Sequence, residues 1–385
     1  MTKSARADST EVLIVGGGPA GSTLARVLTQ AGMRVVVLDK AVFPRDKICA
    51  GWVTPAVMEE LELDLEDYAG DNVLQPIHGF RTGRLGQKLV QSEFPGQPAS
   101  YGIRRKEFDH YLLKRCGAEL MLGQGFKSMQ RDGDGWLVNG SIRAELVVGA
   151  GGHFCPVARA IGAKGPRETA VAAQEIEFEM TARQQTDCPV SAELPELFFT
   201  PDLKGYGWVF RKGGFLNVGL GREDKHKLAG HVERFCNYLK QTGRIPMDTP
   251  GKLKGHAYLL YPHCRDPVVN DGVLLIGDAA GLAYAQSGEG IRPAVESALL
   301  AASSIIDCQG DYSTGRLQSY VDKLEERFGP RNTQAVRGGS SSPRLKQYLA
   351  GMLLKNNWFS KNLLIKRWFL HEQDKPLSAP DTQRS

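Results

Sequence analysis

Three glycines and an aspartate near the N-terminus have the types and spacing of a nucleotide-binding site. Gly16, Gly18 and Gly21 form a G-x-G-x-x-G motif, Ala20 lies inside it, and Asp39 follows at the distance typical of dinucleotide-binding folds. Such glycines allow a sharp turn and close approach of the backbone to a pyrophosphate, while the carboxylate accepts hydrogen bonds from a ribose. The motif predicts a bound adenine dinucleotide, with NAD and FAD both open, whereas a ligand-free glycine turn is the simpler alternative.

The segments around this motif read as the elements that must position it. Residues 11–15 are a short apolar strand, an apolar-periodic helix runs to Gly32, and residues 34–38 form a second buried strand that ends at Asp39. This order predicts a βαβ unit whose turn carries the glycines.

A second glycine-rich segment precedes a helix late in the chain. Asp278 is followed by Gly288, Gly290 and Ile291, and a run of Ala, Leu and Val then has the composition of a helix with Pro293 in its first turn. The N-terminus of a helix offers unpaired N–H groups and partial positive charge. We therefore expect an anion or an electron-rich ring edge to lie there, although a structural turn would use the same residues.

Together these segments resemble the flavoproteins of the p-hydroxybenzoate hydroxylase fold, and within them the geranylgeranyl reductase-like branch. That family pairs an N-terminal G-x-G-x-x-G with a late G-D-A-A-G and S-G-E-G-I, both present here, whereas Gly151 stands where the family usually has aspartate. The resemblance implies bound FAD, with Asp278 near the ribityl chain and pyrophosphate. It also implies that the helix after Gly288, Gly290 and Ile291 points at the N1/C2=O edge of the flavin.

Two further motifs carry the same resemblance. Arg105 fits the family's R-x-x-F-D helix entry, which implies contact with the FAD pyrophosphate, and the neighbouring Arg104 could substitute for it. Both could instead be exposed cations at the start of a helix. Cys49 occupies the cysteine position of a K-x-C-G-G loop, with Ala50 in place of one glycine, which implies a catalytic position beside the isoalloxazine. A buried, inert cysteine is the alternative.

Between residues 168 and 261 the pattern changes to short alternating runs that predict an antiparallel sheet. Tyr206, Trp208 and Phe210 keep the family's Y-x-W-x-F spacing, although Arg211 replaces the proline that should end it. At a period of two, the three rings share one face of a strand, where they could line a pocket for an apolar substrate or pack in the core of the sheet.

We therefore predict an α/β protein with a Rossmann-type FAD-binding domain, a second antiparallel β-sheet substrate domain and a C-terminal helical tail. The three parts comprise, in turn, residues 9–80 with 100–165 and 265–330; residues 81–99 with 166–264; and residues 331–385.

The C-terminal tail is basic and amphipathic. After residue 330 the chain contains ten Lys and Arg residues but only three Asp and Glu residues. A helical stripe there contains Leu345, Tyr348, Leu349, Met352 and Leu353. A second apolar cluster spans residues 363–370. The tail could be a packed helix pair with a solvated basic face, or it could make peripheral contact with an anionic membrane.

Composition limits the other classes of function. The 385 residues are 42% apolar and 24% charged, with no apolar run long enough for a signal peptide or a membrane span, so we expect a cytoplasmic protein. Seven cysteines without regular spacing predict neither disulfides nor a metal site. No nucleic-acid-binding signature is present.

The expected function is that of an FAD-dependent oxidoreductase. NAD(P)H would bind transiently and deliver hydride, and the enzyme would reduce a carbon–carbon double bond of an apolar substrate, for which an isoprenoid is one candidate. A second G-x-G-x-x-G for a resident nicotinamide cofactor does not occur in the sequence. Two alternatives stay open: a monooxygenase that hydroxylates or epoxidises an apolar or aromatic substrate, and a lipid-binding protein that retains FAD without turnover.

Overall fold

The computed structural model describes residues 8–164, 170–224, 228–249, 252–331 and 353–381. Its first sheet has a parallel centre in the order β18-β11-β1-β2-β8, and antiparallel strands flank it. Its strands are β1 (Asp8–Val15), β2 (Val35–Asp39), β8 (Glu119–Leu122), β9 (Met129–Asp132), β10 (Gly135–Val138), β11 (Ile142–Gly149), β17 (Val269–Asn270) and β18 (Val273–Leu275).

Apolar strands fix this architecture. The Val, Ile and Leu side chains of β1 and β11 are almost fully buried, which is typical of parallel strands covered on both faces. Helix α1 packs against α8 and α4 beside the sheet. The helices of this part are α1 (Pro19–Gln30), α2 (Pro55–Glu60), α3 (Leu65–Asp71), α4 (Arg105–Lys114), α5 (Pro156–Ala160), η1 (Tyr261–His263), η2 (Gly277–Ala279), α8 (Ile291–Cys308) and α9 (Thr314–Phe328). The predicted βαβ unit is confirmed, with α1 ending before Gly32.

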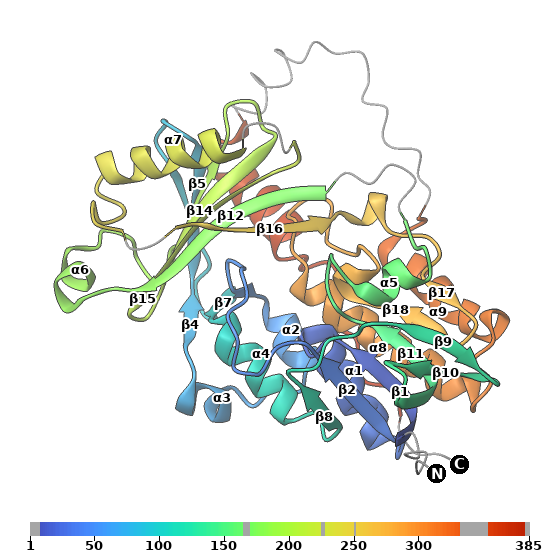
Figure 1. Ribbon diagram of the computed structural model, residues 1–385. Coiled ribbons are helices and arrows are strands. Elements are labelled where there is room, and N and C mark those ends of the chain that lie inside the picture. The colour runs from blue at the N-terminus through green and yellow to red at the C-terminus, as the bar shows by residue number, and fades with distance from the viewer. Residues whose placement is uncertain (1–7, 165–169, 225–227, 250–251, 332–352, 382–385) are drawn as a thin grey trace.

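The second sheet forms the other lobe of the molecule (Figure 1). Its order is β16-β12-β15-β14-β13-β5-β6, from strands β5 (Gly79–Arg84), β6 (Val90–Glu93), β12 (Ala170–Glu179), β13 (Glu196–Phe199), β14 (Gly205–Lys212), β15 (Phe215–Arg222) and β16 (Lys254–Leu259). The predicted antiparallel sheet is present, and the prediction is wrong in one detail, because β13 pairs with β5 in parallel. These two strands come from distant chain segments, so no hairpin reverses the direction between them.

The two faces of the second sheet have different neighbours. Helix α7 (Leu228–Gln241) packs on one face through Val232, Phe235 and Leu239, and α6 (Ala182–Asp187) lies in the loop after β12. The opposite face carries the predicted aromatic run and contacts the C-terminal segment. A small sheet of β3 (Trp52–Val53), β4 (Leu74–Ile77) and β7 (Ser100–Ile103) connects the two lobes.

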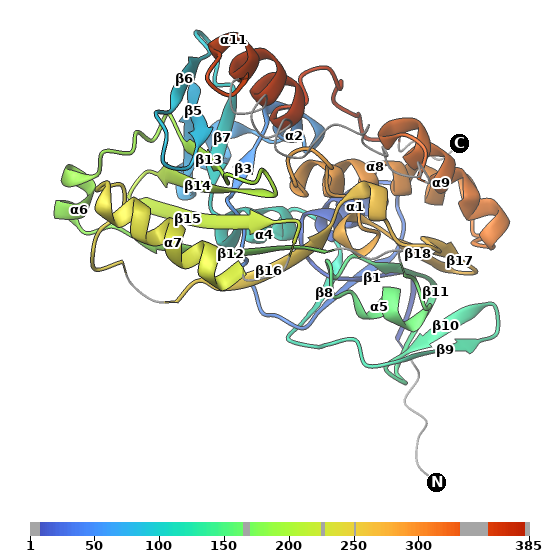
Figure 2. The same ribbon diagram turned by 90° about the horizontal axis from the view of Figure 1, so that it is seen from above.

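The C-terminal segment includes the short helix α11 (Asn357–Phe359) and the π-helix η3 (Ser360–Phe369). Figure 2 shows this segment beside β5 and β6, on the side of the second sheet away from α7. Leu364, Ile365 and Phe369 are buried there, so the apolar cluster predicted at residues 363–370 is packed. In the described part of the chain, no helix is both long and apolar enough to cross a membrane.

Candidate active site

One cavity of about 730 Å³ lies between the two sheets, and both contribute to its wall. It is lined on one side by the loop after β1, the end of β2 and the start of α8, and on the other by the second sheet. All of the predicted site residues line it except Gly21 and Arg104. Segments far apart in the sequence therefore meet at one place.

The three glycines of the first motif have different reasons to be glycine. At Gly16, φ is +120°, and an added Cβ would lie 2.4 Å from the carbonyl oxygen of Ala150. A Cβ at Gly21 would lie 1.9 Å from the carbonyl oxygen of Gly16, so this residue serves helix packing and not the cavity. A Cβ at Gly18 would meet no protein atom closer than 3.6 Å and would occupy the cavity itself.

Asp39 ends β2 at the edge of the cavity. One carboxylate oxygen accepts a hydrogen bond from the backbone N–H of Gly17 at 2.7 Å, and the other accepts one from Ala41 at 2.8 Å. These bonds fix the carboxylate while each oxygen keeps a lone pair for another donor. Asp39 is thus oriented to receive a hydroxyl group.

Arg104 and Arg105 begin α4 but point in different directions. Arg105 lines the cavity and makes a bidentate ion pair with the buried Asp109, at 2.7 and 2.9 Å. Arg104 does not line the cavity; its guanidinium lies 3.6 Å from the ring centre of Phe215 and pairs with Glu177 at 3.1 Å. The alternative that Arg104 substitutes for Arg105 is therefore not favoured by the structure, because the two neighbouring side chains diverge at the start of α4 and only Arg105 reaches the cavity.

Arg45 is a second cation on this wall, and the motifs did not single it out. It lies 3.2 Å from Asp109, so one buried carboxylate holds both Arg45 and Arg105 at the cavity. The pair provides net positive charge next to the open backbone of Gly18, as a diphosphate requires.

The loop before α8 supplies another part of the wall. Gly290 is the N-cap of α8, and an added Cβ there would lie 3.0 Å from a carboxylate oxygen of Asp278. Burial raises the pKa of Asp278, although Lys47 and Arg105 oppose this shift. Glu289 lies in the same loop, and burial raises its pKa to about 8.

These residues fit FAD. The open backbone at Gly18, the oriented Asp39 and the Arg105 cation match the pyrophosphate and ribose of a dinucleotide. The Oε1 atom of Glu289 is a buried acceptor without a hydrogen-bond partner among the described residues, which fits a ligand that brings its own N–H or O–H donors. Ile291 starts α8 at the same wall, where the helix N-terminus favours an electron-rich group.

Two rows of paired residues cross the second sheet beside the cavity, and Leu197, Trp208, Glu175, Tyr206, Ala173 and His256 from these rows line it. One row runs Leu197, Trp208, Gly219, Glu175 across β13, β14, β15 and β12, and the next runs Phe199, Tyr206, Gly221, Ala173, His256. The wall therefore changes from aromatic and aliphatic at one end to carboxylate and imidazole at the other.

The glycines between these ends make room for the indole. A Cβ at Gly219 would lie 2.2 Å from the Cζ2 atom of Trp208 and 2.7 Å from the Cβ of Glu175. The indole therefore lies over β15 and reaches toward Glu175. Trp208 is 7% exposed and donates its indole N–H to Asn217 at 2.7 Å, so it is both buried and part of the cavity wall.

The loop with Cys49 is held by polar side chains of the second sheet. The backbone N–H of Cys49 donates to Glu175, and its carbonyl oxygen accepts from Asn217 at 3.2 Å. Lys212, almost fully buried, donates to the carbonyl oxygen of Ala50 at 3.0 Å and pairs with Glu177. Cys49 is partly buried and lines the cavity, so this scaffold fixes the residue that the sequence analysis proposed as catalytic.

Lys47 and His256 close the polar end of the cavity. The Nζ atom of Lys47 lies 3.2 Å from Nδ1 of His256. Burial and the nearby Arg105 lower the pKa of Lys47, while burial and Lys47 lower the pKa of His256 to about 3. His256 is therefore neutral at physiological pH, and its Nδ1 can accept a hydrogen bond from the Lys47 ammonium.

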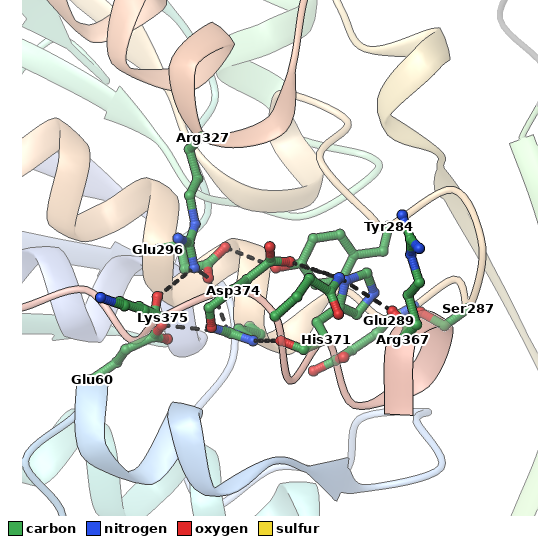
Figure 3. A network of polar contacts seen from close by, with 12 residues as sticks. Glu60, Tyr284, Ser287, Glu289, Glu296, Arg327, Arg367, His371, Asp374 and Lys375 are labelled. Carbon is green, nitrogen blue, oxygen red and sulfur yellow. Dashed lines mark hydrogen bonds and ion pairs between the residues drawn. The ribbon is translucent and has the colours of Figure 1, made fainter. Parts of the chain in front are cut away.

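A buried charge network joins the C-terminal segment to α8 (Figure 3). The Arg292 guanidinium is fully buried and lies 3.4 Å from Glu60 and 2.9 Å from Glu296. It also donates to the carbonyl oxygens of His371 at 3.2 Å and Asp374 at 2.6 Å. Burial, with the charge of Glu296, raises the pKa of Glu60 to about 8. The segment that follows η3 is thus attached to the helix whose N-terminus lines the cavity.

The same segment reaches the cavity directly. Phe369, the last residue of η3, lines the cavity and contacts Tyr206 with ring centres 5.4 Å apart. Of the predicted helical stripe, Leu353 is 46% exposed, and the other four residues lie outside the described part of the chain. Contact of the tail with a membrane stays a prediction.

Sequence reasoning missed Glu175, His256, Arg45 and Phe369. Glu175 had one usable signal: in the strand A-A-Q-E-I-E-F-E, the acids alternate with Ile176 and Phe178, so one face is apolar and the other acidic. An acidic face on a strand inside a domain indicates a site. Nothing in the local sequence places Phe369 or His256 near the nucleotide motifs.

Comparison with known proteins agrees with this geometry. The FAD binding domain family matches residues 9–334. A digeranylgeranylglycerophospholipid reductase of Methanosphaera stadtmanae is 27% identical over 90% of this chain and 91% of its own length. A menaquinone reductase of Mycobacterium tuberculosis is 31% identical over 77% of this chain and 76% of its own.

A solved structure shows the same fold. The geranylgeranyl bacteriochlorophyll reductase-like protein of Thermoplasma acidophilum superposes with a TM-score of 0.71 at 22% identity, and the match covers 90% of this chain and 88% of that protein. The likeness therefore extends over both lobes and includes most of the described chain.

Proposed function

Because the chain belongs to the FAD binding domain family, and within it to the geranylgeranyl reductase-like flavoproteins, we propose that it is an FAD-dependent reductase of a carbon–carbon double bond in an apolar, isoprenoid-bearing lipid. NAD(P)H is the proposed source of electrons. Bound FAD supplies hydride transfer, which is chemistry that no side chain of the protein can provide.

The observation that carries this proposal is the continuity of the cavity. The nucleotide wall, from Gly16 to Arg105, passes directly into the aromatic wall of Tyr206, Trp208 and Phe210 without a separating partition. An apolar chain over these rings would lie next to whatever the nucleotide wall holds. Apolar rings disfavour water beside a bound chain, and a dry site favours hydride transfer over side reactions.

The relatives support the substrate class. Their names assign them to the reduction of a digeranylgeranylglycerophospholipid and of menaquinone, and both are lipids with isoprenoid chains. An aromatic wall that includes Tyr206, Trp208 and Phe369 suits such a flexible apolar chain better than it suits a small polar substrate.

An oxygen balance distinguishes the proposal from a monooxygenase. We expect NAD(P)H consumption to rise when a geranylgeranyl-bearing phospholipid is added, with no matching rise in oxygen consumption and with product that has gained two hydrogen atoms. Oxygen uptake equal to NAD(P)H consumption, with one oxygen atom in the product, would establish the monooxygenase instead. Absence of NAD(P)H consumption with every lipid would favour a flavin-retaining binding protein.

A further inference from the structure

Saturation of a double bond requires a proton as well as a hydride, and the cavity contains few groups that can give one. The donor must face the cavity, be held in place, and lie next to the wall where the double bond is expected. Among the described cavity residues, the groups that could give a proton near the aromatic wall are the thiol of Cys49, the carboxyl groups of Glu175 and Glu289, and the phenols of Tyr206 and Tyr258. Burial raises the pKa of both phenols, which makes them weaker acids than the carboxyl groups. Of these residues, only Cys49 belongs to a motif whose resemblance implies a catalytic position.

Glu175 meets the geometric requirements best. It lies on the central part of β12, in the same cross-strand row as Trp208, with only Gly219 between them. Its side chain therefore begins where the indole surface ends. Its carboxylate accepts the backbone N–H of Cys49, which fixes its direction, and the residue is 5% exposed. Glu289, by contrast, does not belong to the strand row that carries Trp208, because it lies in the loop before α8, between Gly288 and Gly290.

The charges around Glu175 keep it available as an acid. Burial raises its pKa to about 7, with the charge of Glu177 acting in the same direction. The Cys49 N–H, Lys212 and Arg105 lower it, and Lys254 is its cross-strand partner on β16. Because the pKa lies near neutrality, the carboxyl group holds a proton in a large part of the molecules at physiological pH.

We infer that Glu175 donates the proton to the double bond, an inference that rests on the proposed reductase function. One alkene carbon receives the hydride and its electron pair from the reduced flavin. The other carbon forms a C–H bond with the proton of Glu175 as the carboxyl O–H bond breaks. Glu175 is left as a carboxylate beside the Cys49 N–H and Arg105, and it regains a proton from solvent before the next turnover.

The test compares Glu175→Gln with Glu179→Gln, an exposed glutamate on the same face of the same strand. Glutamine keeps the acceptor for the Cys49 N–H but has no acidic proton, so the loop stays in place while proton transfer stops. Reduced, FAD-loaded protein is mixed without oxygen with a geranylgeranyl-bearing phospholipid, and oxidation of the flavin is followed across a pH series. We expect E175Q to be slower by about 10²-fold or more, and E179Q to match the wild type.

The pH profile separates proton donation from a structural role. The wild-type rate should fall as the pH rises through about 7, and E175Q should lose this dependence while reduction of its flavin by NAD(P)H is unchanged. A wild-type rate and profile in E175Q, or loss of the profile in Cys49→Ser or Glu289→Gln instead, would overturn the inference. Failure of the wild type itself to oxidise its flavin with lipid would overturn both the inference and the proposed function.

Unfolding gives a readout that does not depend on turnover. An acid whose folded-state pKa is raised from 4.5 to about 7 holds a proton that the unfolded chain releases between these values. The wild-type midpoint of thermal unfolding should therefore fall relative to that of E175Q as the pH rises from about 5 to about 8. A constant difference between the two midpoints over this range would show that Glu175 does not titrate there and would contradict the assignment.

Discussion

Gly18→Val is expected to give a folded protein without yellow colour. A valine side chain at residue 18 would meet no protein atom closer than 3.6 Å at its Cβ, and the backbone there has φ −77°, which any residue adopts. The added methyl groups would occupy the space where a pyrophosphate meets the backbone. Charge-assisted hydrogen bonds contribute about 1.5–3 kcal/mol each, so loss of two should weaken FAD binding by about 10²-fold or more.

The measurement is the ratio of flavin absorbance to protein after desalting, together with thermal unfolding of the apoproteins. Gly70→Val is a matched control, because a Cβ at Gly70 meets nothing within 4 Å and lies away from the cavity. Gly21→Ala should behave differently again and destabilise the fold, because its Cβ would overlap the carbonyl oxygen of Gly16. Full flavin content in Gly18→Val would mean that the dinucleotide does not contact this loop.

Arg292→Met should destabilise the protein by about 3–5 kcal/mol, because it leaves the buried Glu60 without its cation and leaves Glu296 with Arg327 alone. Glu60 and Glu296 have fully buried side chains, and Arg292 lies between them. The loss should grow with pH. The pKa of Glu60 is raised to about 8 in the wild type, and loss of Arg292 raises it further. Above about pH 8 the folded variant therefore still holds a proton that the folded wild type has released, so the variant loses additional stability as the pH rises.

Urea unfolding of the FAD-saturated protein at about pH 6 and about pH 9 measures this effect. Arg34→Met is the control, since Arg34 is 66% exposed and pairs with Glu11 at 3.7 Å, a contact that should contribute about 1 kcal/mol or less. Equal losses in the two variants, or a loss in Arg292→Met that does not depend on pH, would show that the buried network does not hold the C-terminal segment.

The nucleotide-binding half of the fold could be predicted because its signals are local. Gly16, Gly18 and Gly21 lie within six residues, and the buried strands on each side show plainly as apolar runs. The parallel pairing of β13 with β5 could not be predicted, because Arg84 and Glu196 are 112 positions apart in the sequence (196 − 84) and no turn chemistry links them.

The residues of the candidate site likewise fall into those that a local motif predicts and those that only the fold places there. Asp39, Arg105 and Asp278 belong to motifs with fixed spacing, so their place at one cavity follows from the resemblance and the fold. Phe369 reaches the cavity through tertiary packing, which local pattern does not encode, and the alternating acids around Glu175 indicate an acidic strand face but not which cavity it lines. Arg104 and Arg105 show the limit most clearly: the motif spacing favours Arg105 but leaves Arg104 open, and the structure shows that Arg105 lines the cavity and Arg104 does not.

The central claim is that one cavity brings an unsaturated isoprenoid chain to FAD for reduction. A single turnover under argon tests it most directly: fully reduced, FAD-loaded protein is mixed with an equal amount of a phospholipid with unsaturated isoprenoid chains. We expect the flavin to become oxidised and one double bond to be saturated for each flavin oxidised, as measured by the mass of the lipid. Flavin that stays reduced under argon and reoxidises only when oxygen is admitted, with an oxygenated or unchanged lipid, would contradict it.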